Sequence, residues 1–271
     1  MPSKKVSTAS AVGTHTDRQF VTSLARGLDV LRCFTADRRM LGTTEISRLT
    51  GLPQPTVWRL THTLVKLGYL IFHPASEQLS VGPGAMSLGY AAAVSTGISE
   101  FASPLLDDIC RRFDVTASLG ANHGLNMVIM QRAENMNAVR LSLHVGSTLS
   151  LGASTLGAAY LCGLLPDRRD EALMQLRTTA PEQWRVNKAF IAEAFTTHSR
   201  YGYVLNLGHS NASINSIGVP IAAFGKTTVL AISCGGPTNI ASSSHLSKRV
   251  APVMLELAQQ LAPLLDTGLR P

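Results

Sequence analysis

Apolar side chains recur at helical spacing near the start of the chain. In the segment 21–36 they fall every three or four residues, at Leu24, Leu28, Leu31 and Phe34. This spacing puts them on one face of a helix, so the segment is predicted to be helical and amphipathic. Residues 1–19 before it are polar and rich in Ser, Thr and Ala. We expect them to form a disordered tail.

Two more helices, joined by a tight turn, are predicted next. The first begins at Thr43 or Thr44, either of which can cap it, and runs to about Leu49. Gly51 tolerates the positive φ of the turn. Prolines at 53 and 55 suit the first turn of the second helix, and Gly68 is its expected C-terminal cap. The buried face of this second helix is expected to comprise Val57, Leu60, Leu64 and Leu67.

Short β-like runs follow at 69–72 and 78–81, joined by a turn at 73–77. A helix, a helix-turn-helix and a hairpin in this order describe a winged helix domain, which we place at residues 20–82. The sequence Gly-Pro-Gly at 82–84 punctuates its end, and the Ala-rich stretch 85–96 predicts a linker helix within residues 83–98.

Beyond this linker the pattern changes to alternating helices and strands. Helices are expected at 104–113, 155–164, 168–176, 188–201 and 243–265. Strands are expected at 115–121, 127–132, 138–143, 203–207, 213–220 and 227–233. Adjacent strand runs with helices at both ends indicate a mainly antiparallel α+β domain, which we place at residues 99–271.

The basic excess is concentrated in the first third of the chain. The 271 residues carry a formal charge of +7. Residues 1–82 hold ten Lys and Arg against five Asp and Glu, whereas residues 83–271 hold fourteen against twelve. A domain that meets a polyanion shows this asymmetry, and so does a basic surface without a partner.

The composition also argues against several classes of protein. The longest apolar stretches fall short of the ~18 residues of a transmembrane helix, and the polar N-terminus does not resemble a secretory signal. The cysteines at 33, 110, 162 and 234 form no CxxC pair, which fits a reducing cytoplasm and argues against a disulfide framework or a zinc site. We therefore expect a cytoplasmic protein with no cofactor, no metal and no membrane partner.

The polar face of the second helix of the helix-turn-helix is the candidate DNA-reading surface, because its first turns would meet base edges in a major groove. That surface carries Gln54, Pro55, Thr56, Arg59 and Thr63. Arg pairs with guanine through two acceptors, Gln pairs with adenine, and Thr binds a phosphate or a thymine methyl. The neighbours Trp58 and His62 suit stacking or backbone contacts, although Trp58 equally suits the core. Residues better placed for phosphates are Arg26, Arg48 and Lys66. The alternative is an amphipathic hairpin whose polar face is only solvated.

Several motifs occur in a set order along the chain. They are SLARGLDVL at 23–31, the helix-turn-helix, LGYL at 67–70, LGASTLGAAYL at 151–161, RYGY at 200–203, IGVPI at 217–221 and AISCGGP at 231–237. Together they resemble the IclR family of bacterial transcription regulators, from about residue 20 to the C-terminus. The resemblance implies a dimer, or a tetramer built from two dimers, and a GAF-like second domain that binds a small organic acid.

The resemblance also implies a pocket in the second domain. Its motif-matched positions are Ala138, Leu149, Thr155, Leu156, Asn206, Ile214, Ser216, Ser233 and Gly235. Such a mixture of apolar walls and a few orienting hydroxyl and amide groups is typical of a small-ligand site. Backbone N–H groups at the start of the helix at 155–164 would also suit a carboxylate. The alternative is that several of these residues only pack or cap the fold.

Two positions depart from the family pattern. Where many relatives carry an acidic residue before the strand end at 218–220, this chain has Asn206 and a Gly208-His209 pair, and Gly152 replaces a frequent His. A less acidic, roomier pocket favours an aromatic or longer-chain acid.

Two rival functions remain. One is a small-molecule hydrolase with an appended helical domain, since GASTLG at 152–157 nearly matches a nucleophile elbow, but its closing glycine is one residue late. Histidines at 123, 144, 198 and 209 form no recognisable base-and-orienter set. The other rival is a DNA-binding architectural protein without a ligand. We expect instead a regulator, not an enzyme, that binds a roughly palindromic double-stranded DNA operator as a symmetric dimer. We also expect its operator binding to respond to a small organic acid.

Overall fold

The computed structural model describes residues 19–35, 37–95, 97–134, 143–226 and 229–268. Two compact units divide the chain, Met1–Ala92 and Ala93–Pro271. All but the last residue of the predicted tail, and all but the last residue of the predicted strand at 138–143, lie outside the described residues.

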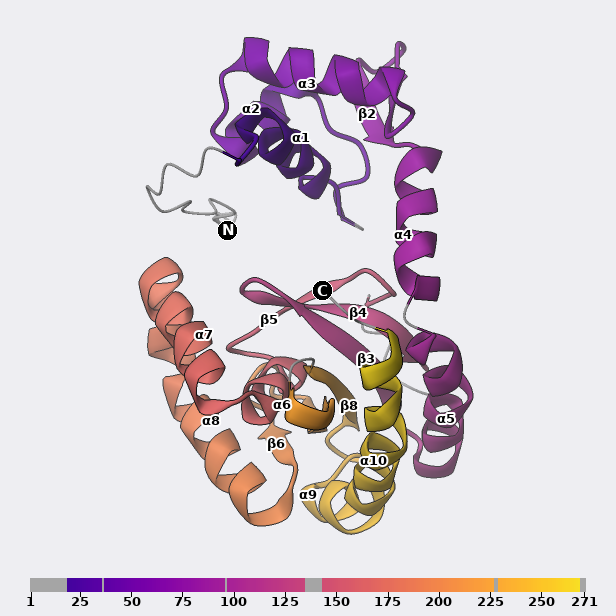
Figure 1. Cartoon of the computed structure of the whole chain (residues 1–271), viewed down its shortest axis with the longest axis vertical. Coiled ribbons are helices and arrows are strands. Elements are labelled where there is room, and N and C mark those ends of the chain that lie inside the picture. Colours follow the sequence, from indigo (N-terminus) through magenta and orange to yellow (C-terminus); the bar gives the residue numbers. More distant parts are fainter. Residues whose placement is uncertain (1–18, 36, 96, 135–142, 227–228, 269–271) are drawn as a thin grey trace. The chain divides into compact units, whose positions relative to one another are not determined.

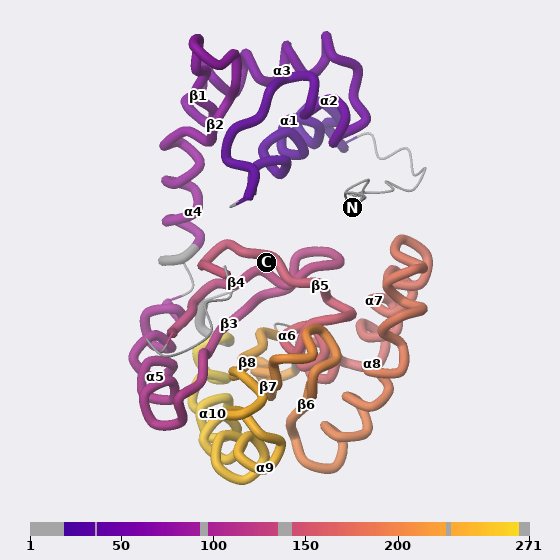
Figure 2. The backbone as a smooth tube through the Cα atoms, turned by 180° about the vertical axis from the view of Figure 1, so that it is seen from behind, coloured from indigo at the N-terminus to yellow at the C-terminus, as the bar shows by residue number. Residues whose placement is uncertain are grey.

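Three helices and a hairpin build the N-terminal unit (Figure 2). The helices are α1 (Thr22–Arg32), α2 (Thr43–Thr50) and α3 (Gln54–Lys66). Strand β1 (Leu70–His73) pairs antiparallel with β2 (Gln78–Val81), and α4 (Pro83–Ser95) follows. This order confirms the predicted winged helix fold with a helix after it.

A small apolar core joins these elements. It comprises Val30, Cys33, Leu41, Ile46, Val57, Leu70 and Leu79. In α1, Leu24 and Leu28 are exposed and the helix buries Val30. One detail of the predicted burial is wrong. At the end of α3, Leu67 is 62% exposed, because it is the C-cap residue and lies past the buried face of the helix.

The turns of the helix-turn-helix follow the predicted backbone chemistry, with one exception. Gly51 ends α2 with φ 70°. Gly68, at φ 76°, follows α3, where the N–H groups of Gly68 and Tyr69 donate to the carbonyl groups of Val65 and Leu64, which is a Schellman motif. The exception is the N-cap of α2, because Gly42 occupies it without a side-chain hydrogen bond, rather than Thr43 or Thr44.

A six-stranded antiparallel sheet is the centre of the C-terminal unit. Its strands lie in the order β5-β4-β3-β8-β7-β6. They are β3 (Thr116–His123), β4 (Asn126–Ala133), β5 (Thr148–Ser150), β6 (Val204–Leu207), β7 (Ile214–Ala222) and β8 (Val229–Pro237). Every neighbouring pair is antiparallel, which confirms the predicted α+β class.

Helices cover both faces of this sheet (Figure 1). On one face lie α5 (Ile98–Phe113) and α10 (Ala251–Gly268), the latter preceded by α9 (Ser243–His245) and the π-helical turn η2 (Leu246–Val250). The other face carries α6 (Thr155–Gly163), against which α7 (Pro166–Thr179) and α8 (Pro181–Tyr201) pack. A short 3-10 helix, η1 (Phe224–Lys226), lies between β7 and β8.

Several predicted boundaries shift. Helix α5 begins at Ile98 rather than at Pro104, and α8 begins at Pro181 rather than at Lys188. Strand β5 was not predicted, because only three residues pair with β4. Short edge strands are specified by their neighbours more than by their own sequence.

A β-bulge interrupts the pairing of β3 with β4. Gly120 pairs with Ile129 and Leu119 pairs with Gln131, so Met130 is the extra residue. A bulge of this kind shifts by one residue the side chains that face each side of the sheet. Ile129 packs with the α6 side, Gln131 donates a hydrogen bond to Ser103 of α5, and Arg132 pairs with Ser118 beyond the bulge.

Candidate nucleic-acid and ligand sites

The outward face of α3 carries the predicted DNA-reading residues. Val57 and Thr61 are buried, and Thr56 is half-buried. The remaining predicted residues of the helix are exposed: Gln54, Pro55, Trp58, Arg59, His62, Thr63 and Lys66. This face therefore has the shape and polarity of a recognition helix.

Local contacts order part of this face. Trp58 is 60% exposed and is not part of the core. Its ring stacks on that of His62, with centroids 5.4 Å apart and planes inclined by 15°. Gln54 Nε2 donates to Thr44 Oγ1 at 3.0 Å, which ties the start of α3 to α2. The Thr63 hydroxyl donates to the carbonyl of Arg59, and its oxygen still has acceptor capacity.

The predicted phosphate contacts come from three helices. Arg26 on α1, Arg48 on α2 and Lys66 on α3 are all exposed. Arg48 forms only a loose ion pair of 3.7 Å with Glu45, and both side chains are solvated. A pair of this kind contributes little, so it leaves Arg48 available to a phosphate.

Most of the predicted ligand-pocket residues share one face of the large sheet, around the start of α6. Ala138 lies outside the described residues. Leu149 is on β5, while Ile214, Ser216, Ser233 and Gly235 lie on β7 and β8. Thr155 and Leu156 are the first two residues of α6, and Asn206 is on β6. Ser216 pairs directly with Asn206 on one side and with Gly235 on the other.

The start of α6 lies tightly against this face. The hydroxyls of Thr155 and Ser216 share a hydrogen bond of 2.5 Å. A Cβ added to Gly218 would lie 2.9 Å from the carbonyl oxygen of Thr155, and one added to Gly120 would lie 3.1 Å from a methyl of Leu156. Both glycines therefore allow the helix to approach the strands closely.

Asn206 has internal partners for its amide. Its Nδ2 donates to Ser210 Oγ, and its Oδ1 accepts from the N–H of His209. Ser210 Oγ in turn donates to the carbonyl of Ala153, just before α6. Asn206 thus fixes the loop between β6 and β7. This matches the alternative in which some of the predicted pocket residues only pack or cap the fold.

A second contact anchors the same loop to α8. His209 Nε2 and Asn187 Oδ1 share a hydrogen bond of 2.7 Å, and the His209 ring stacks on Phe190 at 4.6 Å. The sequence reasoning did not single out Asn187 or Phe190. They lie on a helix that begins seven residues before the predicted start, and no local motif marks them.

Arg132 is the charged residue that the sequence reasoning missed. Its side chain is only 7% exposed, and it lies on the α6 face of the sheet with its direct partner Ser118. The available signal was an arginine near the end of NMVIMQRA, a run that contains four consecutive apolar residues.

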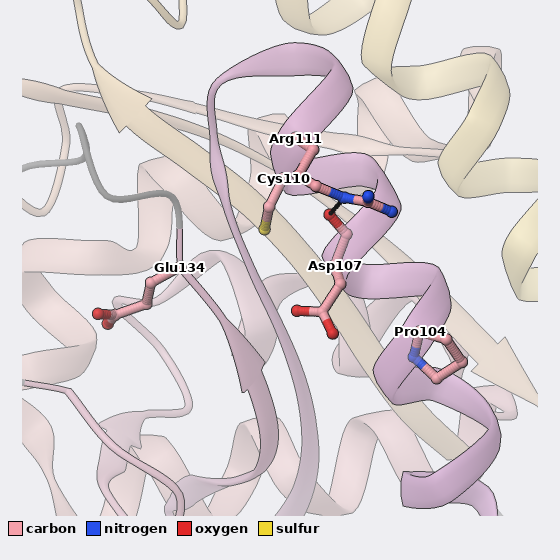
Figure 3. A pocket seen from close by; sticks show the side chains of 5 residues that line it. All are labelled: Pro104, Asp107, Cys110, Arg111 and Glu134. Carbon is pink, nitrogen blue, oxygen red and sulfur yellow. Dashed lines mark hydrogen bonds between the residues drawn. The ribbon is translucent and has the colours of Figure 1, made fainter.

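The hollow beside α5 contains none of the predicted ligand residues (Figure 3). It measures about 440 Å³ and is lined by Pro104, Asp107, Cys110, Arg111 and Glu134. Its polar lining is mainly acidic, so it is a poor match for an organic acid.

The candidate nucleophile of the hydrolase hypothesis has a structural role. Ser154 is the N-cap of α6, and its side chain accepts a hydrogen bond from the N–H of Gly157. A Cβ on Gly157 would collide with the backbone of Leu151, so this glycine serves close packing. The segment is a capped helix start.

The cysteines are buried and unpaired. Burial raises the pKa of the Cys110 thiol and that of Cys162 to about 12. Among the residues that the structure describes, no three or more His, Cys, Asp or Glu side chains form a group that would suit a metal ion. Nor, within the same ranges, does any helix have the length and apolar character required to cross a membrane.

Comparison with known sequences matches both units. Residues 23–73 match the IclR helix-turn-helix domain, and residues 90–263 match the C-terminal domain of the bacterial transcriptional regulator IclR. The chain is also 30% identical over 243 residues to the HTH-type transcriptional regulator TsaQ1/TsaQ2 of Comamonas testosteroni, covering 89% of this chain and 87% of that protein.

Solved structures agree. An IclR family transcriptional regulator from Brucella abortus superposes with a TM-score of 0.83 at 36% identity, covering 93% of this chain and 95% of that one. An IclR homolog from Microbacterium hydrocarbonoxydans, crystallised with 4-hydroxybenzoate, gives a TM-score of 0.68 at 24% identity, covering 90% and 99%. The second likeness shows the fold alone.

Proposed function

The chain belongs to the IclR family of bacterial transcriptional regulators, and we propose that it binds a two-part operator as a homodimer and that a small organic acid changes its affinity for that operator. The observation that carries the DNA-binding part is the polar, exposed face of α3 after the Gly51 turn. As a protein that reads bacterial DNA, it would work in the cytoplasm.

In this proposal α3 enters the major groove. Arg59, Gln54 and Thr56 contact base edges, and Thr63 contacts bases or the adjacent backbone. Flanking contacts come from Pro55 and from the stacked pair of Trp58 and His62. The cations Arg26, Arg48 and Lys66 bind phosphates and set the register without reading sequence.

Exposed apolar side chains support a dimer. On and just before α1 they are Phe20, Val21, Leu24 and Leu28, and on α4 they are Met86, Leu88 and Tyr90. Helix α4 has no charged residue along its length. Exposed apolar side chains in this number on a small unit are typical of a protein contact, and we assign them to contact with a second copy of the chain.

The acid would bind on the α6 face of the sheet, in the unit that we place at residues 99–271. Leu149, Leu156 and Ile214 supply apolar contacts there, and the hydroxyls of Thr155, Ser216 and Ser233 supply orienting groups. Asn206 shapes the site by holding the β6–β7 loop. The 4-hydroxybenzoate found in the relative from Microbacterium hydrocarbonoxydans motivates aromatic acids as first probes.

Ligand binding and DNA binding would be coupled through the linker at residues 83–98. A ligand shifts the equilibrium between two arrangements of the dimer only if it binds them with different affinity. Coupling of this kind usually amounts to about 1–3 kcal/mol.

The test begins with selection of operators from a random library of DNA duplexes with the full-length protein. We expect two inverted half-sites whose centres lie one helical turn, or a multiple of it, apart. The Arg59→Ala variant, processed in parallel, is expected to select a site that is degenerate at one position of each half. Recovery of random sequence by the parent protein would contradict the proposal.

A further inference from the structure

Arg132 is a buried cation whose hydrogen bonds are incomplete. Its Nε donates to Glu134 Oε1 at 2.6 Å, and its Nη1 donates to Ser118 Oγ at 2.9 Å. Its Nη2 is buried and has no hydrogen-bond partner among the described residues. Leaving a donor of a charged group unsatisfied in the interior is costly. An orphan of this kind points to an acceptor that the described residues do not supply.

The bulge at Met130 determines where Arg132 points. Strict alternation from Ile129 would put Gln131 on the α6 side and Arg132 on the α5 side. The extra residue reverses this, so that Gln131 bonds Ser103 of α5 and Arg132 bonds Ser118 on the α6 face. Bulges commonly re-aim a side chain next to a functional site.

Arg132 stands at one end of a row of small and polar residues that crosses the sheet. Arg132 pairs with Ser118, Ser118 with Ser233, and Ser233 with Gly218. Gly218 lies directly under Thr155, the first residue of α6. Since neighbouring strands are ~4.8 Å apart, the row from Ser118 to Gly218 is about 10 Å long.

We propose that Arg132 binds the carboxylate of the effector through Nη2 and the second N–H of Nη1, while the body of the acid lies over Ser118 and Ser233 toward Thr155. The inference rests on the proposed function and adds to it the residue that selects an acid over a neutral molecule. Arginine suits this task, because its planar fork of N–H donors matches the two oxygens of a carboxylate.

Glu134 is the internal counterion of the same site. Its side chain is 39% exposed, against 7% for Arg132, and its carboxylate points away from α5 (Figure 3). It engages only Nε of the guanidinium. The edge formed by Nη1 and Nη2 is therefore the one that donates hydrogen bonds to a ligand carboxylate. The negative charge of Glu134 repels that carboxylate.

The experiment compares acids with their neutral amides. Benzoate, 4-hydroxybenzoate and phenylacetate, with benzamide, 4-hydroxybenzamide and phenylacetamide, are titrated into the full-length protein by calorimetry. The Arg132→Met variant is expected to lose roughly 10–100-fold in affinity for the acids and to bind the amides as the parent does. Arg132→Lys, which keeps the charge but not the fork, is expected to fall between them.

Two further variants distinguish carboxylate recognition by Arg132 from a general effect of positive charge and from a loss of folding. Arg111→Met removes an exposed cation of α5 and is expected to leave acid affinity unchanged. Glu134→Gln removes the competing carboxylate and keeps Arg132, so it is expected to tighten acid binding several-fold. If the ion pair between Arg132 and Glu134 is purely structural, Glu134→Gln weakens acid binding instead. The Glu134→Gln variant therefore tests the proposal even if Arg132→Met does not fold.

The outcomes distinguish this inference from the proposed function beneath it. Equal acid affinity in Arg132→Met and the parent, or weaker acid binding in Glu134→Gln, overturns the role of Arg132 and leaves the regulator intact. A parent protein that binds none of the acids, and whose operator affinity none of them alters, overturns the proposed acid sensing and this inference with it.

Discussion

The hydroxyls of Thr155 and Ser216 share a hydrogen bond of 2.5 Å that joins the first residue of α6 to strand β7. Thr155 is buried and Ser216 is half-buried. The bond therefore joins the packed start of α6 to a more accessible position on β7. A ligand that bonds either hydroxyl would compete with this contact or extend it.

Ser216→Ala is expected to weaken binding of an acid effector by about 2–10-fold, because one net hydrogen bond contributes about 0.5–1.5 kcal/mol. The variant is expected to bind operator without ligand as the parent does, since Ser216 lies in the C-terminal unit. Calorimetry and fluorescence anisotropy measure the two quantities. Unchanged acid affinity would remove Ser216 from the ligand site.

The elements that could be predicted from the sequence are those specified by local chemistry. Gly51 and Gly68 adopt the left-handed conformation that their turns require, and prolines lie at the start of α3. The exposed face of α3 follows because its apolar residues recur at helical spacing. Trp58, which suited either environment, is exposed and stacks on His62.

What could not be predicted depends on pairing between distant segments. The bulge at Met130 reverses the faces of Gln131 and Arg132, and alternation within β4 alone points the other way. The role of Asn206 depends on Ser210 and on the carbonyl of Ala153, which is 57 residues from Ser210 in sequence. Helical spacing placed Leu24 and Leu28 on the apolar face of α1 but does not show what covers that face, and both side chains are exposed.

Arg59→Ala is expected to cost about 1–3 kcal/mol of operator affinity and to relax specificity at one base pair of each half-site. Lys66→Ala, the matched change at a predicted phosphate contact, is expected to weaken operator and random DNA alike. Anisotropy at fixed salt measures both. An equal loss on operator and random duplex for Arg59→Ala would show that Arg59 contacts only the backbone.

Leu24→Asp is expected to weaken self-association and to lower operator affinity by tenfold or more. Burying a leucine contributes about 1.5–3 kcal/mol, and an aspartate at the same position opposes burial. Leu24→Met preserves an apolar side chain and serves as the control. Sedimentation gives the assembly state. Parent-like association and operator binding by Leu24→Asp would place the dimer contact elsewhere.

Alkaline pH is expected to destabilise the C-terminal unit in part through Cys162. Burial raises the pKa of this thiol from 9.0 to about 12 in the folded chain. The folded state therefore holds the proton more tightly, and the stabilisation is complete below pH 9 and is lost as pH rises toward 12. At pH 10 the loss amounts to about 1.4 kcal/mol.

Urea unfolding under reducing conditions at pH 8 and pH 10 measures this loss. The Cys162→Ala variant begins less stable, because it lacks a buried sulfur, but is expected to lose less stability between the two pH values than the parent. An identical loss in parent and variant would show that the Cys162 thiol does not titrate in this range.

The most direct test of the proposed acid-responsive regulation measures how the acid changes operator affinity and how the operator changes acid affinity. The operator affinity of the full-length protein is determined by anisotropy with and without an acid that binds it, and the acid affinity by calorimetry with and without operator. We expect a change of about 5–150-fold in operator affinity, and by linkage the same factor in acid affinity. Acid affinity that is identical in the free and the operator-bound protein would contradict the account.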